Sequence, residues 1–281
     1  MLFNKTNFDY NSIILFVHIP KSGGTSLRES LTKNFRNDEV LRTTEPFINH
    51  YLENNFNQSI KKGNKSSIKN FLKKIPLIKK LRSKFHFKDL FIPQDPSLRD
   101  FYSLTTNELQ KLKFISSNQE RDCVPQILGK HYLRIMIIRN PIDRIQSYYF
   151  YAKRIEGRKP YMLAARKYDI DDWIKYLYDY RPFMLTNPYS VSISGAQDFK
   201  IAEEIIDKKF YLIAPFEKIE EFYELLSFSF FGVRDKISKL RIGTNNPKKI
   251  VISDNLIERI KASNKIDINL KKKVEEEFNQ I

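Results

Sequence analysis

A loop of small and basic residues follows the first apolar segment of the chain and has the composition of a phosphate-binding site. Residues 20–24 read Pro-Lys-Ser-Gly-Gly and lie between the apolar run 13–19 and a helical pattern that opens with Thr25 and Ser26. Paired glycines let the backbone approach an anion closely, and the amides that begin a helix favour negative charge. Lys21 adds a cation, while the hydroxyls of Thr25 and Ser26 can cap the helix and donate to the same phosphate.

Two other interpretations of this loop are weaker. A plain turn with a helix cap would use Gly-Gly-Thr-Ser, but it would leave the preceding strand and lysine unexplained. In the P-loop of Mg-dependent ATPases a Lys-Ser/Thr pair follows the glycines, whereas Lys21 precedes them and no such pair follows. We therefore expect a nucleotide-like anion that is bound without a metal.

A second group of polar residues follows another apolar run, at 133–138. Arg139 ends this predicted strand, Asn140 is a favourable N-cap, and Pro141 suits the first position of a helix. The helix would carry Ser147 about two turns from its start, where the long side chain of Arg139 can reach the same anion. The alternative is that Arg139 makes an ion pair and Ser147 lies on a helix surface. Arg144 is equally compatible with a solvated charge.

Together the two segments resemble sulfotransferases that use 3′-phosphoadenosine-5′-phosphosulfate (PAPS), in particular the Golgi-type carbohydrate branch with heparan sulfate 2-O-sulfotransferases and bacterial relatives. Residues 18–26 resemble the 5′-phosphosulfate loop of that family, and residues 139–148 resemble its second signature. The resemblance implies that Lys21 contacts the phosphosulfate bridge, that the amides of 22–26 wrap the 5′-phosphate, and that Arg139 and Ser147 bind the 3′-phosphate. The implied donor-binding residues are Lys21, Ser22, Gly23, Gly24, Thr25, Ser26, Arg139 and Ser147. Arg241 is a weaker candidate, which a basic loop explains equally well.

Sulfuryl transfer needs a base for the acceptor hydroxyl and a cation for the leaving phosphate. Lys21 can supply the cation. Members of the resembled branch often carry a histidine at the end of the strand that precedes the arginine signature, but that place here reads Ile-Ser-Ser-Asn-Gln-Glu at 115–120. Other branches use a glutamate after the first helix and second strand, and Glu45 occupies such a place. We predict Glu45 as the base, with Glu120 and His50 as alternatives. A helix-stabilising carboxylate would explain Glu45 almost as well, and a chain without a base would bind PAPS without turnover.

The surrounding pattern predicts the elements that position these residues. Continuous apolar runs at 13–19, 133–138 and 210–214 predict buried parallel strands, with weaker strands at 39–43 and 113–116. Helical patterns occur at 25–35, 141–154, 171–180, 199–206, 218–228, 254–263 and 267–278. This alternation predicts an α/β fold, which we expect to be a P-loop-like three-layer fold with a central parallel sheet flanked by helices.

Length and composition favour one folded domain over residues 1–281, because 281 residues with 41% hydrophobic side chains can bury a large core. Residues 59–88 hold eleven Lys or Arg and no acid, which we interpret as a basic insertion. Cys123 is the only cysteine, so an intrachain disulfide is excluded and a reducing compartment fits. No signal peptide or long apolar run is present, and we expect a cytoplasmic protein without a transmembrane segment.

The net charge of +16 points to anionic partners, but it does not choose among them. We expect PAPS as co-substrate, no metal, and a glycan or other hydroxyl-bearing acceptor, which can itself be anionic. Lipid, peptide tyrosine and small phenols stay open as acceptors, and the sequence does not indicate an oligomeric state. The alternatives are a nucleotide-dependent phosphotransferase and a non-catalytic polyanion binder. No nucleic-acid-binding module is recognisable, so we expect no nucleic-acid partner.

Overall fold

The computed structural model describes residues 12–42, 104–117, 130–237 and 251–281. The chain divides into two compact units, residues 1–41 with 104–281 and residues 42–103. Apart from Arg42, all described residues belong to the first unit. The expected basic insertion at 59–88 and Cys123 lie outside the described residues. The prediction of one domain over residues 1–281 therefore stays a prediction.

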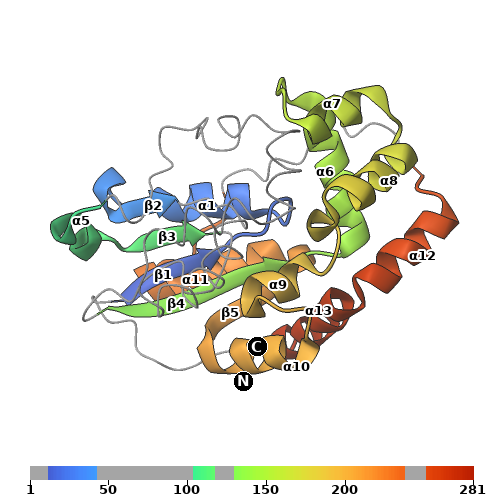
Figure 1. The fold of residues 1–281 in the computed structure, drawn as a ribbon. Coiled ribbons are helices and arrows are strands. Elements are labelled where there is room, and N and C mark those ends of the chain that lie inside the picture. Colours follow the sequence, from blue (N-terminus) through green and yellow to red (C-terminus); the bar gives the residue numbers. More distant parts are fainter. Residues whose placement is uncertain (1–11, 43–103, 118–129, 238–250) are drawn as a thin grey trace, which may run out of the picture. The chain divides into compact units, whose positions relative to one another are not determined.

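A five-stranded sheet with the order β2-β3-β1-β4-β5 forms the centre of this unit (Figure 1). β1 pairs in parallel with β3 and β4, and β4 pairs in parallel with β5. The strands are β1 (Ser12–Val17), β2 (Val40–Arg42), β3 (Phe114–Ser117), β4 (His131–Ile138) and β5 (Phe210–Pro215). Every residue of β1 and β5 is buried, which explains their continuous apolar sequences.

Helices and short 3-10 turns connect and flank the strands. The helices are α1 (Gly24–Thr32), α5 (Thr106–Lys111), α6 (Pro141–Arg154), α7 (Pro160–Lys167), α8 (Ile170–Tyr180), α9 (Pro188–Ser194), α10 (Phe199–Lys209), α11 (Ile219–Phe231), α12 (Asp254–Ser263) and α13 (Lys265–Phe278). The 3-10 turns are η1 (Asn37–Glu39), η4 (Pro182–Met184) and η5 (Phe216–Lys218). No helix in the described ranges is long and apolar enough to span a bilayer.

Two apolar clusters hold these elements together. In the first, side chains of β1, β4 and β5 pack against α1 and α11, with Phe16, Leu31 and Phe222 fully buried. In the second, α6, α7, α8 and α12 pack around Trp173, which is also fully buried. Figure 1 shows α6, α7 and α8 beyond the end of the sheet at which β4 finishes. The second cluster therefore fixes the helix that starts where Arg139 leaves the sheet.

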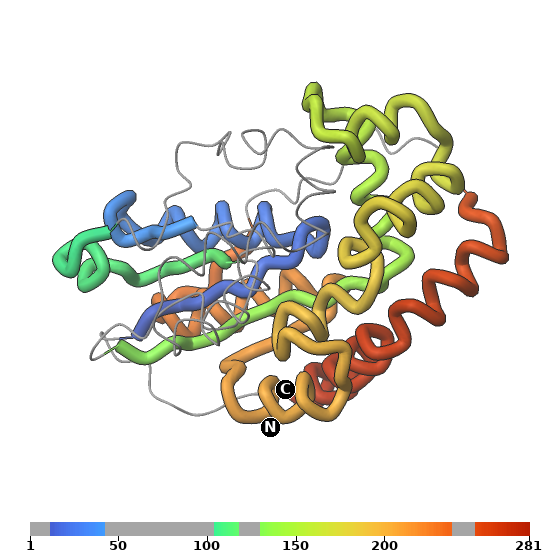
Figure 2. Tube along the Cα trace, viewed as in Figure 1, coloured from blue at the N-terminus to red at the C-terminus, as the bar shows by residue number. Residues whose placement is uncertain are grey.

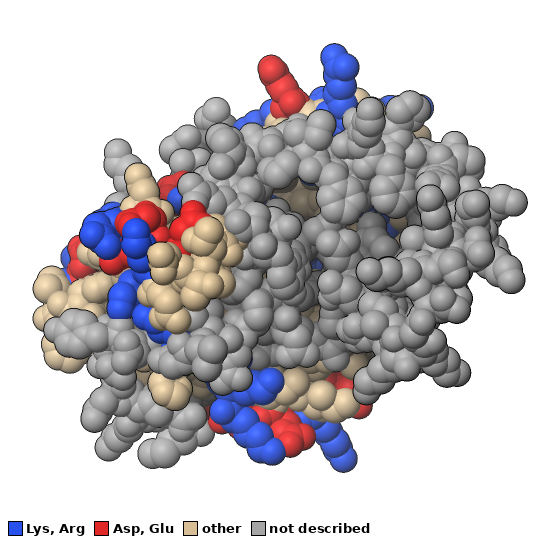
Figure 3. Space-filling model, turned by 60° about the vertical axis from the view of Figure 1, so that its left-hand side comes forward, with Lys and Arg blue, Asp and Glu red and all other residues tan. Residues whose placement is uncertain are grey.

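The α/β fold with a central parallel sheet flanked by helices is confirmed. All five predicted strands are present, and α6 and α12 have the predicted bounds. The helices α5, α7 and α9 were not predicted. Charged side chains of both signs lie side by side on the face shown in Figure 3. Ion pairs between such groups include those of Asp38 with Arg36 and with Lys111. The basic surplus of the chain is therefore not a single uniform patch on the described part of that face.

Candidate active site

The two predicted motifs meet at the carboxyl-terminal edge of the sheet. Val17 at the end of β1 is in register with Met136 of β4, so the loop 18–23 and Arg139 leave neighbouring strands close together. Figure 2 shows the start of α1 and the start of α6 at the same end of the sheet. In open α/β sheets, ligands bind at this edge.

The loop after β1 has an unusual backbone that turns it tightly into α1. Lys21 and Gly23 both have positive φ values, 73° and 85°. The Ser22 side chain is buried, and its amide and hydroxyl both donate to the carbonyl of Ile19. α1 begins at Gly24 with Gly23 as its N-cap and no side-chain cap. Thr25 and Ser26 therefore lie in the first helical turn, and the expectation that they cap the helix is wrong because the helix starts before them.

Packing as well as backbone conformation requires the two glycines. A Cβ atom on Gly23 would lie 2.6 Å from the ring of Phe216, and one on Gly24 would lie 2.0 Å from the ring of His18. The His18 ring stacks on Phe16 beneath the loop, with 5.4 Å between ring centroids. Burial, together with Arg28 and Lys21, lowers the pKa of His18 to about 3. His18 is therefore a neutral packing residue.

Lys21 lies in a site rich in positive charge. Its Nζ atom is 4.5 Å from the centroid of the Tyr151 ring, which is within the range of cation–π attraction. Burial, then Arg154, then Arg139 lower the pKa of Lys21 to about 8. Among the described residues no carboxylate forms an ion pair with Lys21. An anionic ligand would relieve this repulsion.

Arg139 connects the end of β4 to the loop after β1. Its Nη1 atom donates to the carbonyl oxygen of Lys21 at 3.1 Å, and its guanidinium lies 4.4 Å from the ring centroid of Phe216. Its buried Nε atom has no hydrogen-bond partner within the described ranges. Arg139 makes no ion pair with a described carboxylate, so the described part of the chain gives no support to the ion-pair alternative. The hydrogen-bonding capacity of this guanidinium, which has five N–H donors, is therefore not exhausted by the bond to Lys21.

α6 presents Ser147 about two turns from its start. Asn140 accepts a hydrogen bond from the amide of Ile142, and Pro141 is the first helical residue, as predicted. Ser147 is partly exposed on this helix. Arg144, in contrast, is buried and donates to the carbonyl oxygen of Met184 at 2.8 Å. The solvated-charge alternative for Arg144 is therefore wrong, because η4 covers its side chain.

Tyr189 contacts Arg139 directly, and Asp267 holds Tyr189 in place. The amide of Arg139 donates to the hydroxyl of Tyr189 at 2.9 Å, and burial raises the pKa of Tyr189 to about 12. The carboxylate of Asp267 on α13 accepts from the amides of Tyr189 and Ser190, at 2.9 and 2.8 Å, and so caps the start of α9. α13 thereby holds α9, and α9 holds the end of β4.

Four contributors to this site were not predicted: Tyr151, Arg154, Tyr189 and Phe216. Tyr151 and Arg154 follow Ser147 by four and seven positions, so helical spacing could have placed them on its face. Phe216 directly follows β5, and the parallel pairing of β5 with β4 could have placed it at the same edge. No local signal points to Tyr189, because its partner Arg139 is 50 residues away.

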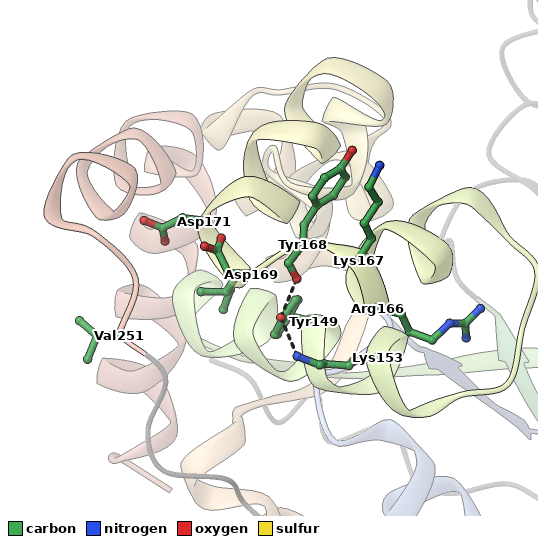
Figure 4. A pocket seen from close by; sticks show the side chains of 9 residues that line it. Tyr149, Lys153, Arg166, Lys167, Tyr168, Asp169, Asp171 and Val251 are labelled. Atoms are coloured by element: carbon green, nitrogen blue, oxygen red, sulfur yellow. Dashed lines mark hydrogen bonds between the residues drawn. The ribbon is translucent and has the colours of Figure 1, made fainter.

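A separate pocket lies on another face of α6 and contains none of the predicted site residues (Figure 4). Its volume is about 480 Å³. Lys153 donates to the hydroxyl of Tyr149 at 3.2 Å, and that hydroxyl donates to the carbonyl of Tyr168 at 3.0 Å. These polar groups of the pocket therefore already bond to one another.

Some predicted residues cannot be placed in this site. Glu45, His50, Glu120 and Arg241 lie outside the described residues, so the assignment of the base and of an additional cation stays a prediction. Among the predicted donor-binding residues, those of the loop 21–26 and Arg139 are brought together, and Ser147 lies on the helix that follows Arg139.

Comparison with known proteins supports the same two motifs. A model of the sulfotransferase family matches residues 5–184, a range that includes the loop after β1, Arg139 and Ser147. No curated protein matches the chain.

Proposed function

Because the chain belongs to the sulfotransferase family, we propose that it transfers a sulfuryl group from PAPS to a hydroxyl group of a carbohydrate acceptor, as in the Golgi-type branch. One observation carries this proposal: Arg139 donates to the carbonyl of Lys21 at 3.1 Å, which joins the two anion-binding motifs in one site. A ligand with phosphate groups at two places matches such a pair. PAPS is such a ligand, since it has a 3′-phosphate and a 5′-phosphosulfate.

The described residues fit this donor. The loop 21–26 provides a cation, hydroxyl groups and the amides that begin α1, and the N-cap residue of this helix, Gly23, has no side chain that could cap them. Arg139 has a buried Nε atom without a partner in the described part of the chain. We assign the 5′-phosphosulfate to the loop 21–26 and the 3′-phosphate to Arg139 and Ser147. PAPS supplies the activated sulfuryl group.

The residues of the chain then have distinct roles. The acceptor oxygen forms a bond to sulfur while the bond between sulfur and the bridging phosphate oxygen breaks, and that bridging oxygen keeps the electron pair. Lys21 neutralises the charge that grows on it. The hydroxyl proton of the acceptor passes to a base, for which Glu45 is the candidate, with Glu120 and His50 as alternatives. Arg139 holds the loop carbonyl at Lys21 in place.

Calorimetric titration with the product 3′-phosphoadenosine 5′-phosphate (PAP) tests the donor. We expect PAP to bind more tightly than ADP, with no requirement for a divalent cation, because only PAP has a phosphate for Arg139 and Ser147. Tighter binding of ADP, or binding that requires Mg²⁺, would favour the nucleotide-dependent phosphotransferase instead.

Labelled PAPS offered with several acceptors tests the second substrate. Neutral oligosaccharides, acidic polysaccharides and a simple phenol separate the acceptor classes, and we expect label in a carbohydrate. Transfer to the phenol alone would contradict the carbohydrate assignment without affecting the donor assignment. A cytoplasmic location stays a prediction.

A further inference from the structure

One face of α6 points at Lys21. Tyr151, whose ring lies 4.5 Å from the Nζ atom of Lys21, and Arg154 are one helical turn apart. Ser147 lies one further turn towards the start of the helix on the same face. At 1.5 Å per residue, Ser147 and Arg154 are about 10 Å apart along the axis, and the long side chain of Arg154 can shorten this span. This face of α6 therefore has polar residues at two positions, Ser147 and Arg154. Lys21 lies against the ring of Tyr151, which is between them in the sequence.

Stacked aromatic rings hold the ring of Tyr151 in place. Tyr148 stacks on Tyr151 with 6.3 Å between centroids, and Tyr161 stacks on Tyr148 at 5.4 Å. Tyr148 and Tyr161 are both buried, and Tyr148 also packs against Trp173. This row of rings reaches into the core formed by α6, α7 and α8. Tyr151 is thus a stable surface against which the flexible lysine side chain is held.

Arg154 adds a second charge beside Lys21. It is exposed at the last position of α6 and makes no ion pair with any carboxylate in the described ranges. Some exposed cations on other helices differ in this respect: Lys175, Lys208 and Lys261 each pair with an acid on their own helix. After burial, Arg154 is the strongest influence lowering the pKa of Lys21. Arg154 therefore raises the local positive potential at the lysine that is assigned to the phosphosulfate.

We propose that Arg154 binds the sulfonate oxygens of PAPS together with Lys21, as a second catalytic cation, and that Tyr151 is a positioning residue for Lys21. The inference rests on the proposed function. The 3′-phosphate is assigned to Arg139 and Ser147, and the sulfonate lies several bonds away from it, at the other end of PAPS. Arg154 is the next cation after Ser147 on the same face of α6. During transfer the sulfonate oxygens stay on sulfur, so Arg154 contacts the group that moves and Lys21 contacts the oxygen that leaves.

A competing explanation is that Arg154 only stabilises the end of α6. Cations in the last turn of a helix interact favourably with its dipole, and Lys153 is equally placed for that effect. Lys153 instead lies near Tyr149, with its Nζ atom 5.3 Å from that ring, and belongs to the pocket away from Lys21. Lys153→Gln is therefore a matched control that removes the same charge from the same helical turn.

The experiment compares PAP, which lacks the sulfonate, with PAPS, which has it. For Arg154→Gln at about pH 7 we expect affinity for PAPS to fall about five- to tenfold, as for the loss of a charge-assisted hydrogen bond at a partly solvated site, while affinity for PAP changes less than about twofold. Release of PAP from PAPS with water as acceptor should slow by at least about tenfold. PAP binding should also persist to higher pH than in the wild type, because Lys21 loses a neighbouring positive charge. Lys153→Gln should match the wild type in all four measurements.

Two substitutions of different size and polarity test the positioning role of Tyr151. Tyr151→Phe keeps the ring and should retain most of the rate, whereas Tyr151→Leu removes the ring and should slow PAP release several-fold with an unchanged circular dichroism spectrum. Equal rates in both variants would overturn the positioning role.

Failure of the Arg154 proposal can be distinguished from failure of the proposed function. Equal weakening of PAP and PAPS by Arg154→Gln would overturn the sulfonate contact and assign Arg154 to a phosphate, and an effect no larger than that of Lys153→Gln would overturn it too. Failure of the wild type to bind PAP would instead contradict the proposed function itself.

Discussion

Donor affinity should depend on the protonation of Lys21. Its pKa is lowered to about 8 by burial and by the positive charges of Arg154 and Arg139. The ammonium form is therefore lost as the pH rises through about 8, well below the usual range for lysine. From that pKa, about nine-tenths of the Lys21 side chains are protonated at about pH 7 and about one-tenth at about pH 9. If only the cation binds the phosphosulfate region, the Kd for PAP should rise about tenfold between these two pH values.

Calorimetric titration of PAP from about pH 7 to about pH 9 measures this dependence. The phosphate groups of PAP are already ionised in this range, since their second pKa is about 6, so the ligand adds little slope. Lys21→Arg gives the matched control, because a guanidinium stays charged throughout and should make the Kd nearly independent of pH. Lys21→Met should bind weakly at both ends of the range, also without a slope.

Two results would refute this explanation. A tenfold change in the Lys21→Arg protein would show that another group titrates, and a flat profile in the wild type would show that Lys21 keeps its proton or does not meet the ligand. Agreement of the wild-type midpoint with a pKa near 8 would support both the burial of Lys21 and the charges of its neighbours.

Three further results are expected. Lys21→Ala should lower turnover roughly 10²- to 10³-fold with the fold intact, as judged by kcat and circular dichroism, because it removes the charge that stabilises the leaving phosphate; wild-type turnover would refute the role. Arg139→Ala should weaken binding of PAP far more than binding of adenosine 5′-phosphosulfate, which lacks the 3′-phosphate, and equal losses in calorimetry would contradict that assignment. Gly24→Ala should destabilise the protein by about 1–3 kcal/mol in urea denaturation, because the new methyl group would lie 2.0 Å from the His18 ring. An unchanged free energy of unfolding would show that His18 moves aside freely.

The sheet and the motif loops could be predicted because their signals are local. β1, β4 and β5 are continuous apolar runs between polar loops, and Asn140 with Pro141 marks the first residue of α6. α7 was missed because its eight residues begin without a side-chain cap. α9 was missed because its cap is Asp267, 78 residues later in the chain, and no local pattern can show such a contact.

The site was only partly predictable for the same reason. Lys21 and Arg139 belong to recognisable motifs, but the supporting contacts of Arg139 come from Tyr189 and from Phe216, which lie on separate elements. Arg144 follows Arg139 closely in sequence and resembles a surface charge, yet it is buried because the carbonyl of Met184, 40 residues away, accepts its hydrogen bond. Burial of an arginine depends on tertiary packing, and the sequence around it does not encode that packing locally.

The contact between Asp267 and the start of α9 also sets an order of events during translation. All residues of β1, β4 and α6 are synthesised before Tyr189, but the carboxylate that caps α9 follows Tyr189 by 78 positions. At a synthesis rate of about 5–20 residues per second, the nascent chain carries an uncapped α9 for about 4 to 16 seconds. During that interval the amide of Tyr189 lacks its hydrogen bond to Asp267, so Tyr189 is not yet held in position next to Arg139. The nascent chain should therefore acquire the sheet early and a well-ordered anion site late, only once Asp267 is available to cap α9.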